Sequence, residues 1–526
     1  MKRSWLPCLV VAALAAMGAG RRATVTPPAF QTCFEGAIGD GPAPSFTTLT
    51  PLESDTIVRA AAAALNVNTA TIAVVDRAGR VQALFRQPAA GAANDDQAVG
   101  VARTAAFFSH NMAPLSSRTV RFISGVHFPP GVVNAPNAPL YGIENTNRGC
   151  DLGILFNNFK EVPPAKSVNG GRGPGIVTGK LQPDDGPYPQ FPFDRPVNAG
   201  GIPLYRGGKL VGGIGVAGIA GDPQLAEFAA VTGAFGTAGI APVPAYPLPE
   251  PGNVFIDGIR LPFLGPDQKL RFDSSGAPVG LERPAGTSPG TSAGTLVGGT
   301  FPGRCADNEY LAGPKGGTLT LTQVDAIVQR AIAAAKRTRG IIRLPLNSYA
   351  RMVIAVADVN GDILALYRMP DATVFSIDVA VAKARNVVAF STQGLPGVTA
   401  GMAITNRTIG FGAQPLFPPG IDSSDPGPFY PLFQSDLANP CQPGNGIVFF
   451  PGATPLYANG KLVGGLGVSG DGVEQDDYVT YLAAGEFLPD RKIWADQVKI
   501  KGVRLPMFKF PRQPEGVTEC GGGPCS

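Results

Sequence analysis

The chain has 526 residues, more than one hydrophobic core normally organises, so its length predicts at least two domains. Its formal net charge of +4 is small for this length, and its Lys and Arg residues are scattered rather than gathered in a stripe. These features argue against nucleic acid as the main partner.

The first twenty residues have the pattern of a removable signal peptide. Met1-Lys2-Arg3 is followed by an apolar run over 5–17 that is too short to span a bilayer and leads to small residues near Gly20. A buried N-terminal helix is the alternative interpretation. We expect residues 1–20 to be removed on export, which leaves a periplasmic or secreted protein. No later run is long and apolar enough to predict a transmembrane helix.

Residues 21–263 and 318–511 contain the same motifs in the same order. Residues 73–86 return as 355–368 at an offset of 282, and the glycine-rich run 209–218 returns as 461–470 at an offset of 252. Because chance does not hold a register this long, we expect two diverged copies of one domain. The first copy carries a long insertion, residues 264–317 form a Gly/Pro-rich connector, and residues 512–526 form a Cys-containing tail.

The second copy shows the order helix, hairpin, helix, hairpin, helix. Thr322-x-x-Asp325 resembles a capping box, Asn360-Gly361 is a favourable hairpin turn, and Ser376 is expected to cap the next helix. This order predicts an antiparallel sheet with flanking helices in each copy, an α+β fold of the α/β sandwich type. The helices are expected from 322 to about 337, over 376–391 and from about 474, and the strands over 353–358, 363–368, 455–457 and 461–468.

Three glycines, Gly464, Gly465 and Gly467, interrupt the last of these strands. Glycine inside a strand indicates a bulge or the close approach of another backbone. A surface that contacts a ligand is the alternative.

Six cysteines follow the expected leader, an even number in an oxidising compartment, which predicts three disulfides. The repeat suggests one pair in each copy and one in the tail, but the sequence does not exclude the other fourteen pairings. Half of a metal site is the alternative for the two tail cysteines. The suggested pairs are Cys33 with Cys150, Cys305 with Cys441, and Cys520 with Cys525.

Several motifs of the second copy together resemble the GlcG/HbpS-like family of heme-binding or heme-degrading domains. They are Asp358-x-x-Gly361, Arg368-Met369, Ser376-x-Asp378-x-Ala380-x-x-Lys383-Ala384, and Gly464-Gly-x-Gly-Val-Ser-Gly470 followed by Glu474-Gln475-Asp476-Asp477. The resemblance covers most of 318–487 and, less closely, 50–235. It implies a profilin-like fold in both copies, heme as the cofactor, a pseudo-dimer within the chain and assembly into a homo-oligomer.

The first copy departs from this pattern. Val101 stands where the second copy has Lys383, and residues 221–224 stand opposite 473–476. We therefore expect the second copy to hold any ligand site and the first to be structural.

Candidate ligand-binding residues follow from the resemblance and from heme chemistry. Iron in heme proteins is held by His, Cys, Met or Tyr, which makes His127 and His110 candidate metal ligands and Tyr367 an alternative. The alternative for both histidines is a surface or loop position, and for Tyr367 it is packing within a strand. Arg86, Arg368 and Lys383 are candidates for holding the carboxylates of heme or of a small organic acid. The alternative for the two arginines is an ion pair with Asp76 or Asp358, and for Lys383 it is a solvated or salt-bridged position.

The leading hypothesis is an exported binding protein for heme or a related tetrapyrrole. The sequence contains no G-x-S-x-G, H-E-x-x-H or Walker motif that would assign a reaction. A heme-degrading or small-organic-acid enzyme is one alternative, and a ligand-free structural or adhesion module is another.

Overall fold

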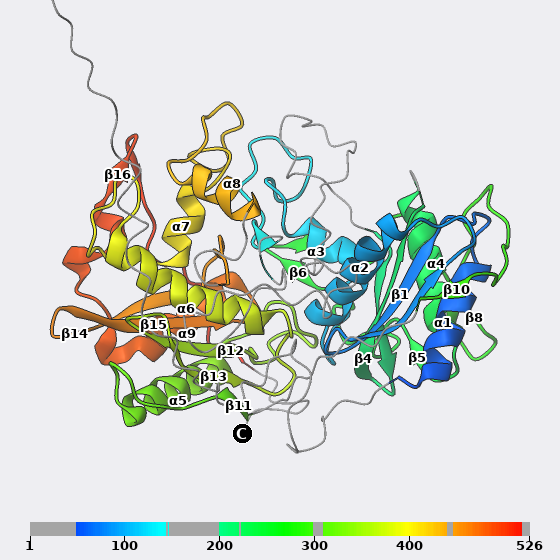
Figure 1. The fold of residues 1–526 in the computed structure, drawn as a ribbon, viewed down its shortest axis with the longest axis horizontal. Helices are drawn as coiled ribbons and strands as arrows, with labels where there is room; N and C mark the ends of the chain where they lie inside the picture. The colour runs from blue at the N-terminus through cyan, green and yellow to red at the C-terminus, as the bar shows by residue number, and fades with distance from the viewer. Residues whose placement is uncertain are drawn as a thin grey trace, which may run out of the picture.

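A computed structural model describes residues 49–143, 146, 199–219, 222–297, 309–438 and 445–517. The expected leader and all six cysteines of the expected disulfides lie outside these residues. Two α+β units are arranged side by side, the first built mainly from residues 49–297 and the second from 309–517 (Figure 1). Within the described residues, none of the helices has the length and apolar character needed to cross a membrane.

The second unit is an antiparallel sheet flanked by helices, as predicted. Its strand order is β11-β13-β12-β15-β14. The strands are β11 (Glu309–Ala312), β12 (Val353–Asp358), β13 (Ile363–Arg368), β14 (Ala453–Ala458) and β15 (Lys461–Ser469). The helices are α5 (Leu321–Arg337), α6 (Ser376–Gln393), α7 (Asn406–Gly412), α8 (Tyr430–Ala438) and α9 (Val473–Ala484), and a short C-terminal hairpin follows in β16 (Lys499–Ile500) and β17 (Val503–Arg504).

The first unit has the same central strand order, in a sheet arranged β10-β2-β1-β4-β3-β5. Its sheet strands are β1 (Thr71–Asp76), β2 (Val81–Arg86), β3 (Gly201–Arg206), β4 (Lys209–Ala217), β5 (Ile240–Ala241) and β10 (Thr295–Leu296). The helices are α1 (Pro51–Ala63), α2 (Asp95–Phe108), α3 (Ser117–Phe122) and α4 (Pro223–Phe235), and two hairpins follow, β6 (Phe255–Ile256) with β7 (Ile259–Arg260) and β8 (Leu270–Phe272) with β9 (Pro278–Leu281).

The two sheets also match in register. Ala73 of β1 faces Gly215 of β4, and Ala355 of β12 faces Gly467 of β15. The β1–β2 and β12–β13 hairpins have their bulge at the same place. A common origin by duplication stays a prediction, but the shared register allows the two units to be compared residue by residue.

Two predicted helix caps are wrong. Helix α5 is capped by Thr320, whose hydroxyl accepts from the backbone N–H of Gln323, rather than by Thr322. Helix α6 begins at Ser376 itself, and the Ser376 hydroxyl lies 2.7 Å from that of Thr373. At both helices the predicted residue has a hydroxyl group at a position suitable for a cap, but the helix begins at a neighbouring residue because of its packing.

The strand glycines are explained by close packing. A Cβ built on Gly467 would clash with the carbonyl oxygen of Ala380, and one built on Gly465 would clash with that of Ala384. Both carbonyls belong to α6, which therefore lies directly on β15 because the strand has no side chains there. The interpretation as close backbone approach accounts for these glycines.

The two units are joined by a continuous buried interface. The end of α2 meets the start of α6, where the rings of Phe108 and Phe375 stack with centroids 3.9 Å apart. The N–H of Val374 donates to the carbonyl oxygen of Phe107 at 3.1 Å. One hydrophobic cluster contains buried residues of both sheets. The two units are therefore packed as one body rather than tethered.

Candidate functional site

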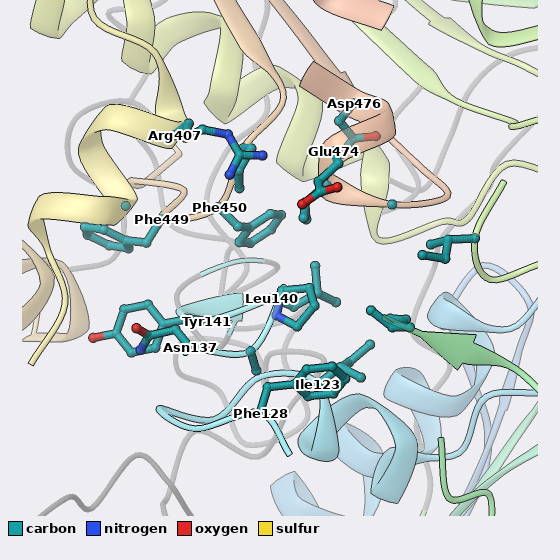
Figure 2. Close-up of a pocket in the computed structure, with 18 of the residues that line it drawn as sticks. Ile123, Phe128, Asn137, Leu140, Tyr141, Arg407, Phe449, Phe450, Glu474 and Asp476 are labelled. Atoms are coloured by element: carbon teal, nitrogen blue, oxygen red, sulfur yellow. The ribbon is translucent and has the colours of Figure 1, made fainter. Parts of the chain in front are cut away.

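A cavity of about 460 Å³ lies at the junction of the two units. This volume is in the range of small-molecule sites. The segments that line it are mainly the insertions of each unit, residues 123–141 and 407–451, together with the start of α9 (Figure 2).

The wall of the cavity is largely apolar and aromatic. The first unit contributes Ile123, Phe128 and Leu140, and the second contributes Phe449 and Phe450 from the segment before β14. These side chains are almost entirely buried. Such a wall favours a flat apolar ligand over a small charged metabolite.

Two basic side chains lie on one side of the cavity. The Nε of Arg407 forms an ion pair with Asp477, which is fully buried, and burial raises the pKa of that carboxyl although Arg407 opposes the shift. Lys509 contacts the carboxylate of Glu474 while its own side chain is 64% exposed. Because an exposed ion pair contributes little, a ligand carboxylate can replace Glu474 at Lys509 at low cost.

A buried ion pair, Lys383 with Asp476, lies behind Phe450. The Nζ of Lys383 donates to Asp476 Oδ2 and to the carbonyl oxygen of Val468, both at 2.9 Å, and lies 5.0 Å from the Phe450 ring centroid. Asp476 belongs to the cavity wall. Burial raises the pKa of Asp476 to about 7, against the effect of Lys383, and burial also lowers the pKa of Lys383. Asp476 can therefore exchange a proton near neutral pH.

The first unit has no such pair at the equivalent place. Gly452 lies against Asp476, and its counterpart Gly200 lies against the methyl group of Ala226. Ala226 therefore corresponds to Asp476, and Val101, which is fully buried, corresponds to Lys383. This result corrects the sequence comparison, which placed residues 221–224 opposite 473–476, because the loop before α4 is two residues longer than the loop before α9.

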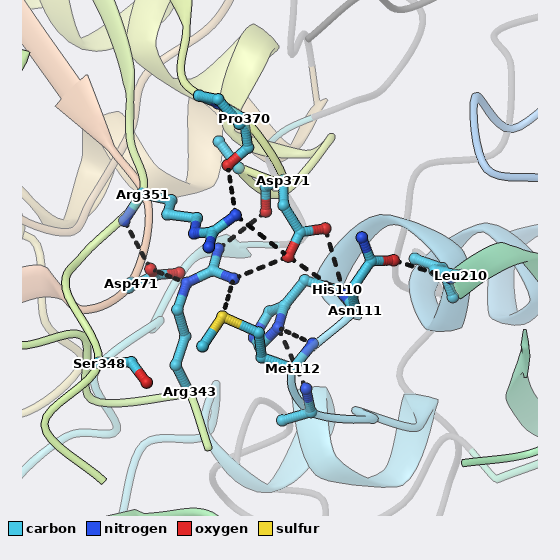
Figure 3. A network of polar contacts seen from close by, with 12 residues as sticks. His110, Asn111, Met112, Leu210, Arg343, Ser348, Arg351, Pro370, Asp371 and Asp471 are labelled. Carbon is cyan, nitrogen blue, oxygen red and sulfur yellow. Dashed lines mark hydrogen bonds and ion pairs between the residues drawn. The ribbon is translucent and has the colours of Figure 1, made fainter. Parts of the chain in front are cut away.

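A second buried polar cluster joins the units beside the cavity (Figure 3). Asp371 accepts from Arg77 of the first unit at 2.5 Å and from Arg343 of the second unit at 3.0 Å. The backbone N–H of Asn111 also donates to Asp371, at 3.2 Å, and Arg343 pairs in addition with Asp471. Although burial opposes it, the surrounding arginines hold the pKa of Asp371 below its ordinary value. This cluster holds the junction together.

Both predicted metal ligands are buried and lie outside the named helices and strands, so the alternative of a loop position is confirmed and that of a surface position is wrong. His110 Nε2 lies 3.0 Å from the carbonyl oxygen of Ile342, and its Nδ1 accepts from the N–H groups of Met112 and Ala113. Burial lowers the pKa of His110 well below its ordinary value. His127 Nε2 lies 2.7 Å from Asp422. A metal at either ring would have to displace these partners.

The predicted carboxylate-binding residues do not come together in the cavity. Arg86 pairs with Asp95 through Nε at 2.9 Å, and Arg368 donates to the carbonyl oxygen of Ala372 at 3.1 Å. The expected pairing of Arg86 with Asp76 is therefore wrong, since Asp76 pairs with Arg80. Tyr367 is partly exposed on β13 and does not belong to the cavity wall, and burial raises its pKa.

The sequence analysis missed Arg407 and Lys509. One signal was present, because Ser116-x-Arg118-Thr119 returns as Thr405-x-Arg407-Thr408. In both units this arginine pairs with a buried acid of the last sheet-flanking helix, Arg118 with Glu227 and Arg407 with Asp477.

Comparison with known proteins gives the following matches. Residues 319–484 match the family model described as haem degrading protein HbpS-like. Over 144 residues the chain is 31% identical to an uncharacterized 15.0 kDa protein of the dhaT-dhaS intergenic region of Citrobacter freundii, which covers 27% of this chain and 81% of that protein.

Two solved structures are also similar. A PduOC:heme complex is 25% identical, over 32% of this chain and 94% of that one, with a TM-score of 0.23. Protein ORFY of Klebsiella pneumoniae is 22% identical, over 32% of this chain and 90% of that one, also with a TM-score of 0.23.

Proposed function

Through residues 319–484 the chain belongs to the haem degrading protein HbpS-like family, and we propose that it binds a tetrapyrrole such as heme in the cavity between its two units. The observation that carries this proposal is the apolar cavity with basic groups on one side. A tetrapyrrole macrocycle is flat and apolar and carries carboxylates at one edge. The cavity offers matching surfaces to both parts of such a molecule.

The macrocycle would lie between the aromatic and aliphatic side chains of the two insertions. Burial of apolar surface contributes roughly 25 cal/mol for each Å² removed from water, so this contact supplies most of the binding free energy. Lys509 would hold a carboxylate at the exposed side, and Arg407 would add its positive charge while it stays paired with Asp477.

Binding of the macrocycle is separate from ligation of its iron. Among the described residues that line the cavity, Tyr141 is the one side chain of a type that holds heme iron, and its hydroxyl donates to the carbonyl oxygen of Ala413 at 3.4 Å. When bound, heme supplies the redox chemistry of its iron. The proposal rests on burial of the macrocycle and assigns no iron ligand, so iron-free protoporphyrin IX is expected to bind about as tightly as hemin.

A heme-degrading activity is a second candidate, favoured by Asp476. Its carboxyl lies in the cavity wall with a pKa of about 7, and such a group can give or take a proton at neutral pH. With hemin bound and a reductant added, we expect the wild type to lose its Soret band. The Asp476→Asn variant should still bind hemin and keep the band. An equal rate in both would exclude Asp476 from the reaction.

The proposal includes export. It is supported by the charged start, short apolar run and small residues of positions 1–20. N-terminal sequencing of the protein recovered outside the cytoplasm is expected to begin near residue 21, and an intact Met1 in that fraction would contradict it.

The decisive experiment is a titration of the purified protein with hemin and with protoporphyrin IX, followed by absorbance. We expect saturation near one equivalent, because the cavity is formed once, at the junction. Asn137→Trp places an indole into the cavity and is expected to abolish binding. The matched control is Asn253→Trp, which places an indole into a second cavity of about 760 Å³ beside the hairpin of β6 and β7, and it should bind normally.

Lys509 provides a test of the carboxylate contact. Lys509→Gln is expected to weaken binding about two- to fivefold, the range of an exposed ion pair. Lys461→Gln removes the same charge from the exposed start of β15 and should change nothing. A nonsaturating titration, or one that is unchanged in Asn137→Trp, would remove the cavity as the site.

A further inference from the structure

The C-terminal segment 490–512 concentrates positive charge. It contains seven Lys or Arg and two Asp, a net charge of +5, whereas the whole chain carries +4. The expectation that basic residues are scattered is therefore wrong for this segment. In Figure 1 the hairpin of β16 and β17 lies at the end of the molecule that faces away from the first unit, whereas Pro506 and Lys509 of the same segment reach the wall of the junction cavity.

The fold itself does not require this charge. The corresponding segment of the first unit, residues 246–268, carries three acidic residues and one Arg, a net charge of −2. Its hairpin turn places Asp257 in the wall of the junction cavity. The second unit has Lys501 at the same turn, and its side chain is 56% exposed. The same structural element, exposed at its turn in both units, is thus acidic in the first unit and basic in the second.

The β16–β17 hairpin brings two of the basic residues together. Lys499 and Arg504 are directly paired across the hairpin, so two like charges face each other. Like charges that face each other in a sheet are destabilising. Of the two residues, Arg504 forms an ion pair with Asp496 at 2.7 Å, which neutralises one of the two positive charges. A partner that supplies negative charge would remove the remaining repulsion.

The aromatic part of the surface begins at Arg491, whose guanidinium lies 4.9 Å from the Trp494 ring centroid. From Trp494 the contacts continue to Phe508 at 5.4 Å and from Phe508 to Phe510 at 6.0 Å, and Phe510 is 40% exposed. Trp494 is only 9% exposed and Phe508 is half-buried, so Phe510 is the ring that this segment presents to solvent. An exposed ring beside lysines is typical of a surface that meets the headgroup region of a membrane.

We infer that residues 490–512 form a docking surface for an anionic lipid bilayer. The segment contains more lysines than arginines. The lysine ammonium acts as a point charge that is attracted by many lipid headgroups together, whereas arginine forms bidentate hydrogen bonds with single phosphates. Phe510 would enter the boundary between headgroups and acyl chains. This attachment is peripheral. Lys509 belongs both to this segment and to the cavity wall, so the test below leaves Lys509 unchanged.

The test is sedimentation of the full protein with vesicles of phosphatidylcholine mixed with phosphatidylglycerol, beside vesicles of phosphatidylcholine alone. We expect binding to the anionic vesicles only. It should be lost near 1 M salt, where the screening length falls to about 3 Å. The substitutions Lys492→Gln, Lys499→Gln and Lys501→Gln together should weaken binding about 100-fold, since each base near an anionic membrane contributes roughly fivefold.

The matched control removes the same number of charges elsewhere, by Lys209→Gln, Lys269→Gln and Lys336→Gln, all at exposed positions outside the segment. This variant should bind the vesicles within about twofold of wild type, because the surface potential decays within about 10 Å at ordinary salt. Equal loss in both variants, equal binding to both kinds of vesicle, or retention by duplex DNA in preference to anionic vesicles would overturn the inference.

Discussion

Replacing the Lys383–Asp476 pair by its first-unit counterpart is expected to leave the second unit about as stable as before, although either single replacement should be strongly destabilising. Lys383 is fully buried and Asp476 is 2% exposed. The first unit builds the same helix–sheet contact with Val101 and Ala226, so the fold tolerates apolar residues at both positions. The matching variants are Lys383→Val, Asp476→Ala and the double substitution.

The expected magnitudes follow from the cost of an unpaired buried charge. Above pH 7, where Asp476 is ionised, each single variant leaves one charge without its partner and should lose about 3–5 kcal/mol of unfolding free energy. The double variant removes both desolvation costs, which is often neutral or stabilising by about 1–4 kcal/mol, while the missing side-chain volume costs about 1 kcal/mol. The two singles should therefore be non-additive by about 5 kcal/mol or more.

Urea unfolding followed by Trp494 fluorescence measures this effect. The chain has two tryptophans, and the other, Trp5, belongs to the expected leader, so the signal reports the second unit. If the double variant loses as much stability as the two singles combined, the pair stabilises the fold and the comparison between the units is refuted. If the double variant is stable, the fold does not need the pair for its stability.

The pH dependence of the double variant provides another prediction. Burial raises the pKa of Asp476 from 3.8 to about 7, so between these values the folded protein keeps a proton that the unfolded chain has released. Wild-type stability should therefore fall as pH rises from about 4 to 7, by at most about 1.4 kcal/mol per unit, and the double variant should show a flatter profile in urea titrations. Gly467→Ala should lower the unfolding free energy by about 1–3 kcal/mol, because the added methyl group clashes with the backbone of α6. Gly91→Ala is the control, since its methyl group would meet nothing within 4 Å, and it should be near neutral. Equal melting temperatures for the two variants would contradict the packing argument. Asp371→Asn should lower the stability of the junction by about 3–5 kcal/mol and split one calorimetric transition into two. Asp425→Asn, at a side chain that is 88% exposed, should do neither. A single unshifted transition in both variants would show that the cluster does not couple the units.

The secondary structure was largely predictable because the local signals agreed with each other. The strands expected over 353–358 and 363–368 lie at those residues, as does the turn at Gly361, whose positive φ of 80° suits glycine. Helix starts were less predictable, since several hydroxyl residues near each start have cap spacing and the choice depends on packing.

The candidate site was predictable only in part. The motifs that contain Lys383 and Asp476 lie beside the junction cavity, but the sequence did not show that these two side chains form an ion pair with each other. Arg86 and Arg368 were chosen because they end matching strands, yet partners from neighbouring turns and helices engage both. The position of an arginine at the end of a strand does not determine which acidic or carbonyl group lies nearest to it in the fold.

The sequence by itself determined the two units, their helix and strand order, and the family, because these depend on periodicity, turn residues and motif spacing within one segment. Only the tertiary structure decided the cavity and the role of each charged residue. The cavity is made of insertions that lie far apart in the chain, and side chains such as Phe128 and Phe450 become one wall when the junction of α2 and α6 brings the two units together. Contacts between distant segments depend on packing against the whole core, and no local pattern specifies them.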